Sequence, residues 1–328
     1  MSKLVTIYGG SGFVGRYMAR RMAKAGWRVR VAVRHPNEAL FVKPYGVVGQ
    51  VEPILCNIRD DASVRAAMLG ADAVVNCVGI LAERGKNSFD AVQIEGATRV
   101  ARLASEEGIG RMVQISAIGA DADSDSDYAR TKAGGEAGVL AHMPDAVILR
   151  PSIIFGSEDE FFNRFAGMTR FSPVLPLVNA DANFQPVYVD DVAHAAEQAL
   201  TGAAQPGVYE LGGPDTESFR ALMQRMLGVI GRRRLILNMP NWMARLTAFG
   251  FDMMQAMTFG LISNGVLTRD QVKNLQNDNV VGEDAKGFDA LGIRPVSMVS
   301  ILPDYLWRFR HSGQYDAIKD SAQNLRRG

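Results

Sequence analysis

Three glycines follow the first apolar run of the chain, and their spacing restricts the fold more than any other feature. Gly9, Gly12 and Gly15 stand in the pattern GxxGxxG directly after Leu4–Tyr8. Backbone approaches a pyrophosphate closely only where side chains are absent, and the following helix offers free N–H groups to the phosphates. The pattern predicts a dinucleotide-binding turn, the alternative being a glycine turn that holds no nucleotide. The predicted cofactor contacts in this turn are Gly9, Gly10, Ser11, Gly12, Phe13, Val14 and Gly15.

Short apolar runs alternate with longer amphipathic segments through the first 150 residues. Strands buried on both faces and joined by crossover helices form a parallel sheet that is covered on both sides. The predicted fold class is therefore α/β, a doubly wound parallel Rossmann sheet. The expected strands are Leu4–Tyr8, Val29–Val33, Val51–Leu55, Ala73–Cys77, Met112–Ile115 and Val147–Leu149, and the expected helices are Phe13–Ala25, Phe89–Glu107 and Tyr128–Ala141.

The alternation becomes less regular after Arg150. Val187–Val189 and Val208–Leu211 still predict strands, with a helix at Asp191–Leu200 between them, and Phe219–Asn264 predicts mostly helix. We therefore expect residues 1–150 to form an NAD(P)-binding Rossmann domain, with residues from about 186 to 212 returning to its sheet. Residues 151–328 are expected to form a smaller, mainly helical C-terminal lobe that offers an interaction surface.

The end of the second expected strand predicts which nucleotide is bound. An NAD site carries an acidic residue there for the ribose 2′-OH, but this chain has Arg34. Residues 1–37 contain eight Lys or Arg and no Asp or Glu. Most of these cations suit a solvated face, while Arg34 and also Arg16 suit a 2′-phosphate. The prediction is NADPH (NADP), and NAD is the alternative.

Charge and cysteine content exclude several other classes of protein. The formal net charge of +1 gives no reason to expect nucleic acid as a partner. The two cysteines, Cys56 and Cys77, lie in or beside apolar runs, so we expect free thiols in a reducing compartment. No signal or transit peptide is expected before Leu4. The most apolar stretch, Met253–Thr268, is too short and too polar for a transmembrane span.

Four further segments resemble the extended and atypical short-chain dehydrogenases, in the order which that family shows. They are Val74–Gly79, the YxxxK pair within Tyr128–Lys132, Leu149–Ser152 and Pro186–Ala193. The resemblance implies a lysine that reaches the nicotinamide ribose. It also implies further cofactor contacts at Asn57, Ile58, Val78, Gly79, Ile115, Ser116, Tyr128, Lys132, Pro151 and Ile153.

The tail of the chain is similar to one branch, the NADH dehydrogenase alpha-subcomplex subunit nine family of respiratory complex I, with its bacterial relatives. The segments that carry this similarity are Leu267–Val272, Asp278–Val281, Leu291–Pro295 and Ile301–Leu306. The resemblance implies a tightly held NADPH in a peripheral subunit that adds stability rather than turnover.

The expected catalytic site lacks one of its three groups. Tyr128 and Lys132 share one helix face, where the lysine would lower the pKa of the tyrosine. The position that carries the catalytic serine in extended members falls here on Ile118. Ser116 is interpreted as a tether of backbone near the cofactor rather than as a group that polarises a substrate. The Tyr–Lys pair is therefore vestigial, in contact with cofactor only, or still catalytic.

The acidic loop Asp121–Asp127 and the second half of the chain were weighed for other functions. The loop lacks the glycine and glutamate of a calcium hand, so we expect no metal, and a cap for the next helix at Ser126 or Asp127. Five methionines between Met239 and Met257 suit core, a protein partner or lipid contact. The triplet Arg232–Arg234 suits a solvated turn, acidic partners or lipid headgroups.

Three functions remain open at this point. The first is a non-catalytic, NADPH-binding accessory subunit of complex I. Its partners would be other subunits of the peripheral arm and of the junction with the membrane arm, with possible lipid headgroup contact, on the cytoplasmic side of the inner membrane. The second is a free-standing NADPH-dependent reductase, epimerase or dehydratase. The third is a non-catalytic redox-sensing regulator.

Overall fold

The computed structural model describes residues 2–83, 85–240, 278–311 and 313. Three segments considered above lie outside the described residues: the methionine-rich stretch after Pro240, Met253–Thr268 and the motif Leu267–Val272. Within the described residues, no helix is long and apolar enough to cross a bilayer.

A seven-stranded parallel sheet forms the centre of the molecule, with the strand order β11-β6-β5-β4-β1-β2-β3. The predicted fold class is confirmed, because the chain starts at β1 inside the sheet, winds outward through β2 to β3 at one edge, and then continues from β4 to β11 at the other edge. The strands are β1 (Leu4–Tyr8), β2 (Arg28–Val33), β3 (Val51–Leu55), β4 (Ala73–Asn76), β5 (Met112–Ile115), β6 (Val147–Pro151) and β11 (Gly207–Leu211).

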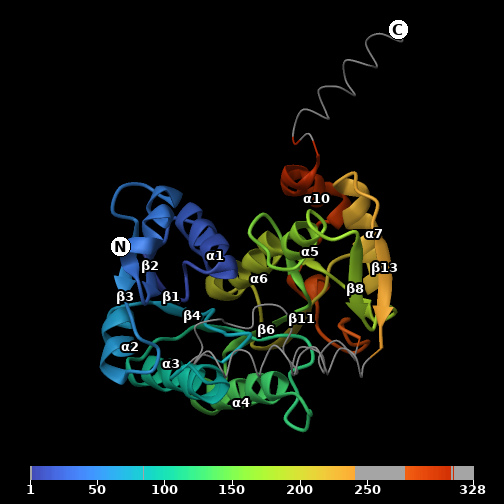
Figure 1. Ribbon diagram of the computed structural model, residues 1–328. Helices are drawn as coiled ribbons and strands as arrows, with labels where there is room; N and C mark the ends of the chain where they lie inside the picture. The colour runs from blue at the N-terminus through green and yellow to red at the C-terminus, as the bar shows by residue number, and fades with distance from the viewer. Residues whose placement is uncertain (1, 84, 241–277, 312, 314–328) are drawn as a thin grey trace.

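Helices cover both faces of this sheet (Figure 1). α1 (Phe13–Lys24), α6 (Val189–Thr201) and the 3₁₀ segment η1 (Pro36–Tyr45) lie on one face. α2 (Asp61–Met68), α3 (Glu95–Glu106) and α4 (Asp127–His142) lie on the other. Alternate side chains of β1 point to opposite faces, so Ile7 packs in the first core and Tyr8 in the second.

Several boundaries and one pairing differ from the sequence prediction. Val187–Tyr188 forms β10, but it pairs with β7 (Ile154–Phe155) instead of the central sheet, and Val189 already begins α6. Of residues 186–212, only β11 therefore returns as a strand to that sheet. β4 ends at Asn76, which leaves Cys77 in the following turn. A three-residue apolar run is too short to specify its partner strand.

The segment predicted as one helix over Phe89–Glu107 begins differently. A π-helical turn, η2 (Asp90–Ile94), precedes α3. The backbone of Gln93 lies directly against Gly135 of α4, where a Cβ on the glycine would come within 2.2 Å of the Gln93 carbonyl oxygen. This close approach of the two helices depends on tertiary packing, which the periodicity of one segment does not report.

The C-terminal lobe packs three helices around a separate apolar core. They are α5 (Phe162–Met168), α7 (Phe219–Val229) and α10 (Met298–Leu306). Three two-stranded sheets accompany them, so the described part of the lobe is less helical than predicted. Proline is rare inside strands, so Pro176 made β8 hard to predict from the sequence. The strand β13 directly follows the arginine triplet. The sheets are β7/β10, β8 (Val174–Val178) with β13 (Leu235–Met239), and β9 (Asn183–Phe184) with β12 (Glu217–Ser218).

Both cysteines are free thiols, as predicted. Burial raises the pKa of Cys56 to about 11 and that of Cys77 to about 12. Neither thiol is therefore ionised near neutral pH, which suits packing rather than redox chemistry.

Candidate functional site

The turn between β1 and α1 leaves no room for side chains at three of its glycines. A Cβ on Gly15 would lie 2.5 Å from the Gly9 carbonyl oxygen and 2.6 Å from the Gly10 Cα, and one on Gly10 would lie 2.9 Å from the Ile7 carbonyl oxygen. Gly9 has φ +71°, which L side chains rarely adopt. Gly12 is less constrained, with only the Gly9 carbonyl oxygen within 3.1 Å of a Cβ. The turn is therefore shaped by Gly9, Gly10 and Gly15 together.

α1 begins immediately after this turn and points its N-terminus toward it. Gly12 precedes the first helical residue, and the first turn carries no acidic side chain. The first-turn N–H groups and the helix dipole are thus available to an anion. Phe13 and Val14 are half-buried at this end, and Phe13 packs edge-on against Tyr17 with ring centroids 6.2 Å apart.

Arg16 and Arg34, the two arginines predicted to hold a 2′-phosphate, are placed differently. Arg16 folds back onto the glycine turn, where its guanidinium donates to the carbonyls of Ser11 at 3.0 Å and Gly12 at 3.3 Å. It also lies 3.7 Å from a Glu158 carboxylate oxygen. Arg34 follows β2, is exposed, and forms no ion pair or side-chain hydrogen bond within the described residues. Arg34 is therefore the arginine with unused donors.

The ends of β3 and β4 carry four more predicted contacts. The exposed Asn57 accepts from the Arg59 N–H at 3.2 Å through its own side chain, and Ile58 is half-buried beside it. Val78 packs against the glycine turn, since its Cγ2 is the atom nearest to a Cβ placed on Gly9. Gly79 lies beside Lys132, whose Nζ would be 3.3 Å from a Gly79 Cβ. The segment after β4 thus meets the glycine turn through Val78 and the YxxxK helix through Gly79.

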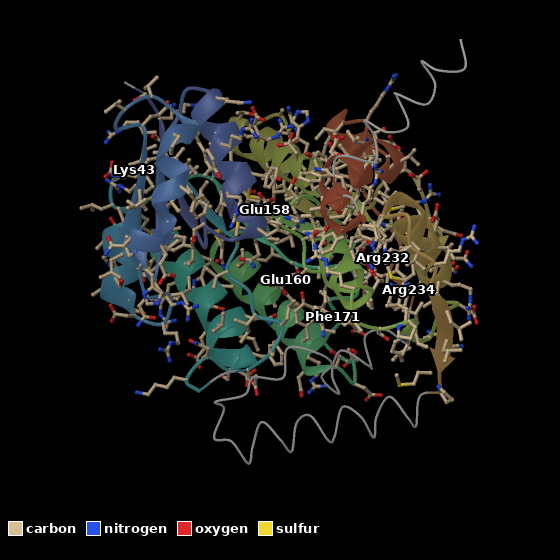
Figure 2. All side chains as sticks on the ribbon, turned by 45° about the horizontal axis from the view of Figure 1, so that its top comes forward. Lys43, Glu158, Glu160, Phe171, Arg232 and Arg234 are labelled. Carbon is tan, nitrogen blue, oxygen red and sulfur yellow. The ribbon has the colours of Figure 1, made fainter. Side chains whose placement is uncertain are left out.

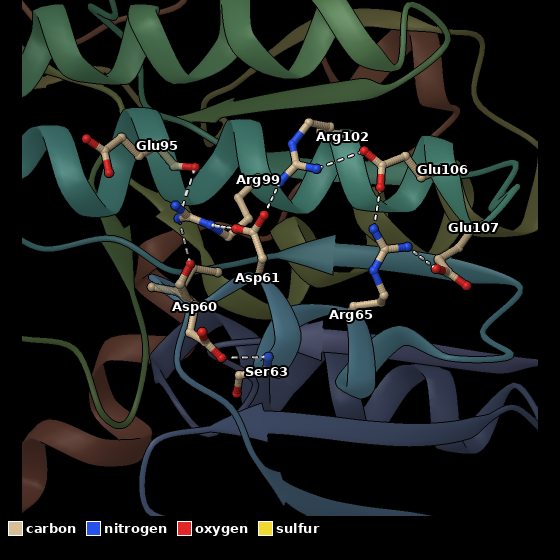
Figure 3. Close-up of polar contacts among 10 residues, drawn as sticks. Asp60, Asp61, Ser63, Arg65, Glu95, Arg99, Arg102, Glu106 and Glu107 are labelled. Atoms are coloured by element: carbon tan, nitrogen blue, oxygen red, sulfur yellow. Dashed lines mark hydrogen bonds and ion pairs between the residues drawn. The ribbon is translucent and has the colours of Figure 1, made fainter.

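An exposed ion-pair network braces the helices below this edge (Figure 3). Asp61 of α2 pairs with Arg99 and Arg102 of α3. Arg65 of α2 pairs with Glu106 of α3 and with Glu107 just beyond it. Asp60 caps α2 by accepting from the Ser63 N–H at 2.8 Å. The network ties α2 to α3. It reaches the predicted site through Arg99, which donates to the Ile58 carbonyl at 3.1 Å, and through Ser63, whose hydroxyl accepts from the Asn57 N–H at 2.9 Å.

Tyr128 and Lys132 lie together on α4, as their spacing predicts. Lys132 is 7% exposed, and its ammonium donates to the Ile115 carbonyl at 3.3 Å. Its Nζ lies 5.7 Å from the centre of the Tyr128 ring, which packs edge-on against Phe89. Burial lowers the pKa of Lys132 to about 8, against the opposing attraction of Glu136.

A partly buried ion pair behind Lys132 is not predicted from the sequence. Arg150 donates to both carboxylate oxygens of Glu136, at 2.9 Å through Nε and 2.6 Å through Nη2. Glu136 is one helical turn beyond Lys132 and on the same face. The guanidinium therefore offsets much of the negative charge that would otherwise support the lysine. The spacing of four residues between Lys132 and Glu136 was the sequence signal that could have shown this carboxylate to lie beside the lysine.

Ser116 and Ile118 follow β5 at the expected catalytic position. Ser116 is 4% exposed and its N–H donates to the Leu149 carbonyl at 2.7 Å. Its Oγ, however, has no hydrogen-bond partner in the described part of the chain. The side chain therefore does not tether backbone as interpreted from the sequence. Ile118 donates its N–H to the Pro151 carbonyl at 3.0 Å and offers no side-chain polar group.

The tail segment after residue 277 reaches this end of the site, which the sequence did not predict. Asn279 accepts from the Ser152 hydroxyl at 2.6 Å, and its amide nitrogen lies 3.5 Å from the Ile118 carbonyl. Val187 donates its N–H to the carbonyl of Ile153, the last predicted contact, at 2.9 Å. Asn279 thus lies beside the position where an active enzyme carries its serine.

The residues present fit a nicotinamide nucleotide. The turn excludes Cβ atoms, the helix N-terminus is free of acids, and Ser116 aims an unpartnered buried hydroxyl next to the β5 end. No group of three metal-ligating side chains gathers among the described residues. In the acidic loop, Ser126 caps α4 by accepting from the Ala129 N–H at 3.3 Å.

Comparison with known proteins gives four findings. The family model described as NAD dependent epimerase/dehydratase matches residues 5–212. NADH dehydrogenase (ubiquinone) 1 alpha subcomplex subunit 9, mitochondrial, of Arabidopsis thaliana is 33% identical over 94% of this chain and 79% of its own length. The 40 kDa subunit of NADH-ubiquinone oxidoreductase from Neurospora crassa is 28% identical over 95% of this chain and 80% of its own length. Ceramide reductase of Caulobacter vibrioides is 29% identical over 73% of this chain and 74% of its own length.

A solved structure shares the fold over almost the whole chain. The dTDP-glucose 4,6-dehydratase DesIV from Streptomyces venezuelae, with NAD bound, superposes with a TM-score of 0.70. The alignment covers 95% of this chain and 98% of that one at 19% identity.

Proposed function

The chain belongs to the NAD dependent epimerase/dehydratase family and, within it, to the family of NADH dehydrogenase alpha-subcomplex subunit nine. On this premise we propose that it is a non-catalytic accessory subunit of respiratory complex I that holds NADPH. One observation carries the proposal. The phosphate-binding turn keeps every residue it needs, whereas Ile118 stands where catalysis needs a hydroxyl.

Nucleotide binding would draw on three parts of the site. The turn from Gly9 to Gly15 and the start of α1 would hold the pyrophosphate. Lys132 would hold the nicotinamide ribose, and the Ser116 hydroxyl would gain the hydrogen bond it lacks. When bound, the nucleotide supplies a hydride that can be transferred.

The choice of NADPH over NADH rests on Arg34. Its guanidinium is exposed at the end of β2 and keeps all its donors within the described residues. A planar, permanently charged fork of this kind suits a phosphate on the ribose 2′ position. An acidic side chain, which NAD sites use there, is absent from residues 1–37.

The lack of turnover rests on the other end of the site. A proton donor alone does not polarise a carbonyl, and Ile118, at the position expected to carry the third catalytic group, has no side-chain hydroxyl. Asn279 and Ser152 hydrogen bond to each other beside it, which leaves their polar groups engaged within the chain. The pair would thus orient the nucleotide rather than transfer its proton.

The partners would be neighbouring subunits of the peripheral arm and of its junction with the membrane arm. Two relatives that match over more than 90% of this chain are named as subunits of the NADH dehydrogenase. The chain would attach peripherally on the cytoplasmic side, with lipid headgroups as a further contact.

Comigration tests the proposal. Membranes from cells that express the chain are dissolved in mild detergent, and the respiratory complexes are resolved by native electrophoresis. We expect the chain in the complex I band, with NADPH recovered from that band after acid release. Absence of the chain from the band would contradict the subunit assignment. Recovery of NAD(H) alone would contradict the proposal that Arg34 selects NADPH.

A second function, NADPH-dependent reduction of a carbonyl, is favoured by the buried lysine. Its lowered pKa, to about 8, and its position beside Tyr128 suit a working proton relay, and one relative is a ceramide reductase. Tyr128→Phe separates the two functions. A reductase would lose most of its turnover, whereas an accessory subunit would still assemble into complex I.

A further inference from the structure

A basic hollow lies on the C-terminal lobe, far along the chain from the nucleotide turn. It is formed between α7 and β13, and its volume is about 450 Å³. Four arginines line it, together with the apolar side chains of Leu227, Leu235 and Ile236. We call this feature the arginine hollow; its arginines are Arg220, Arg232, Arg233 and Arg234.

Within the described residues, no acidic side chain balances the positive charge of the hollow. None of the four arginines forms an ion pair within the described residues, and the nearby Glu217 is already paired with Arg225. Burial, and then the charges of Arg234 and Arg170, lower the pKa of Arg232. Like charges held together without counter-ions favour an anionic partner.

Two of the arginines are fixed in place by backbone carbonyls. Arg234 donates to the Thr169 carbonyl through Nε at 3.0 Å and Nη2 at 2.8 Å. Arg232 donates to the Phe309 carbonyl at 2.9 Å. Figure 2 shows both on the same side of the lobe. The sequence interpretation of the triplet as a solvated turn is therefore wrong for these two residues.

The other two arginines keep their donors free. Arg233 is exposed and Arg220 is partly exposed, and neither side chain has a hydrogen-bond partner among the described residues. The two fixed arginines add positive charge beside the two free ones, whose donors remain available to an anion although their side chains lose rotamer freedom on binding.

Exposed apolar side chains accompany the hollow. Leu235 is 59% exposed on its rim. Phe171 is 91% exposed and follows Thr169, the residue that holds Arg234, by two positions. Arginine and aromatic side chains without lysine are typical of protein interfaces.

We propose that the arginine hollow docks an acidic segment of a neighbouring protein chain, with carboxylates bound by Arg220 and Arg233 and an apolar side chain packed on Leu235. The proposal deepens the proposed function and rests on it for the identity of the neighbour as a complex I subunit. The binding chemistry of the hollow is independent of that identity.

Binding of a defined peptide tests the chemistry on the full chain. The probe is a fluorescent decapeptide of glutamate and leucine, with a glutamine-for-glutamate peptide as its control. We compare the parent chain with Arg220→Glu/Arg233→Glu and with Lys24→Glu/Arg28→Glu, which makes the same charge change at two exposed cations of the Rossmann domain. Far-ultraviolet circular dichroism and urea denaturation report that each variant is folded.

We expect the glutamate peptide to bind the parent chain and the Lys24/Arg28 variant equally. The Arg220/Arg233 variant should bind it at least about tenfold more weakly. Raising the salt concentration from about 50 to about 300 mM should weaken binding of the glutamate peptide to the parent chain. Equal binding by both variants, or binding of the glutamine peptide, would overturn the proposal. So would sedimentation with phosphatidylglycerol vesicles that depends on Arg220 and Arg233 while the peptide does not bind.

Native electrophoresis then separates this inference from the proposed function. Loss of the Arg220/Arg233 variant alone from the complex I band supports both. If the parent chain itself is missing from the band, the subunit assignment fails while the peptide result still decides the hollow. If the parent and the Arg220/Arg233 variant remain in the band equally, the hollow is not the docking contact.

Discussion

The two ends of the candidate site differ in how much of their chemistry is kept. At the phosphate end, the packing of the backbone leaves no alternative to glycine at position 15 and little at position 10. At the nicotinamide end, Tyr128 and Lys132 are in place but the third group is Ile118, and Asn279 is bonded beside it. In the proposed account, the first end keeps the features that phosphate binding needs, and the second keeps two of the three groups that catalysis needs.

This difference teaches that holding a nucleotide and using it are separable properties of the fold. Binding depends on backbone shape, on a helix terminus and on one free arginine. Turnover depends on three side chains acting as a unit, so the loss of one removes most of the rate. Variants that affect the two ends unequally are therefore the way to test the account.

The largest effect is expected at the phosphate end. Gly15→Ala places a Cβ 2.5 Å from the Gly9 carbonyl oxygen, so the turn has to open. We expect NADPH affinity to fall roughly 100-fold, equivalent to about 3 kcal/mol. Gly110→Ala is the matched control, because nothing lies within 4 Å of its Cβ. Isothermal titration measures both, and equal affinities for the two variants would contradict the role of the turn.

The next effect separates NADPH from NADH. Arg34→Ala removes a charged hydrogen-bond donor from the end of β2, and we expect NADPH affinity to fall about 30-fold, or about 2 kcal/mol. NADH affinity should stay unchanged, since NADH lacks the 2′-phosphate. The exposed Arg28 at the start of β2 provides the control as Arg28→Ala. If both nucleotides weaken equally, Arg34 does not read the phosphate.

Lys132 makes the stability of the nucleotide-free chain depend on pH. Its pKa is lowered on folding to about 8, so between pH 8 and its unfolded value the folded chain binds fewer protons than the unfolded chain. Burial of the charged lysine therefore lowers the free energy of unfolding most strongly below pH 8, and this loss becomes smaller as the pH rises above 8.

The comparison with Lys132→Met isolates this contribution. From pH 7 to pH 9 the parent should gain about 1 kcal/mol of unfolding free energy relative to Lys132→Met, measured by urea denaturation. The exposed Lys24, changed to Met, should show no such pH dependence against the parent. Parallel curves for the parent and Lys132→Met would mean that the buried lysine titrates normally.

The smallest effect is expected at Ser116. Because its Oγ has no partner in the described structure, Ser116→Ala should change the unfolding free energy of the nucleotide-free chain by less than about 0.5 kcal/mol. NADPH affinity should fall about fivefold, because the hydroxyl would bond the nucleotide. Ser152→Ala, which loses the bond to Asn279, should instead destabilise the free chain. An unchanged affinity in Ser116→Ala would remove this residue from the site.

Much of the Rossmann half could be predicted from the sequence because its signals are local. Leu4–Tyr8 is an apolar strand, the glycines follow at once, and α1 is amphipathic with five buried residues. The same holds for Tyr128 and Lys132, whose contact depends only on helical spacing.

The remainder depends on contacts between distant parts of the chain. Asn279 meets Ser152 across 127 residues, and Arg150 meets Glu136 between a strand and a helix. No periodicity reports such pairings. The unbonded Ser116 hydroxyl was misjudged for the same reason, since its surroundings come from several strands.

The fate of a labelled hydride tests the central claim most directly. The purified chain is loaded with NADPH deuterated at C4 of the nicotinamide and incubated with a cell extract that contains membranes. The bound nucleotide is then acid-released and analysed by mass spectrometry. The account predicts NADPH that retains its deuterium, because Ile118 leaves the site without its third catalytic group. Recovery of NADP⁺, or of NADPH that has lost its label, would show that the chain spends the hydride and would contradict the account.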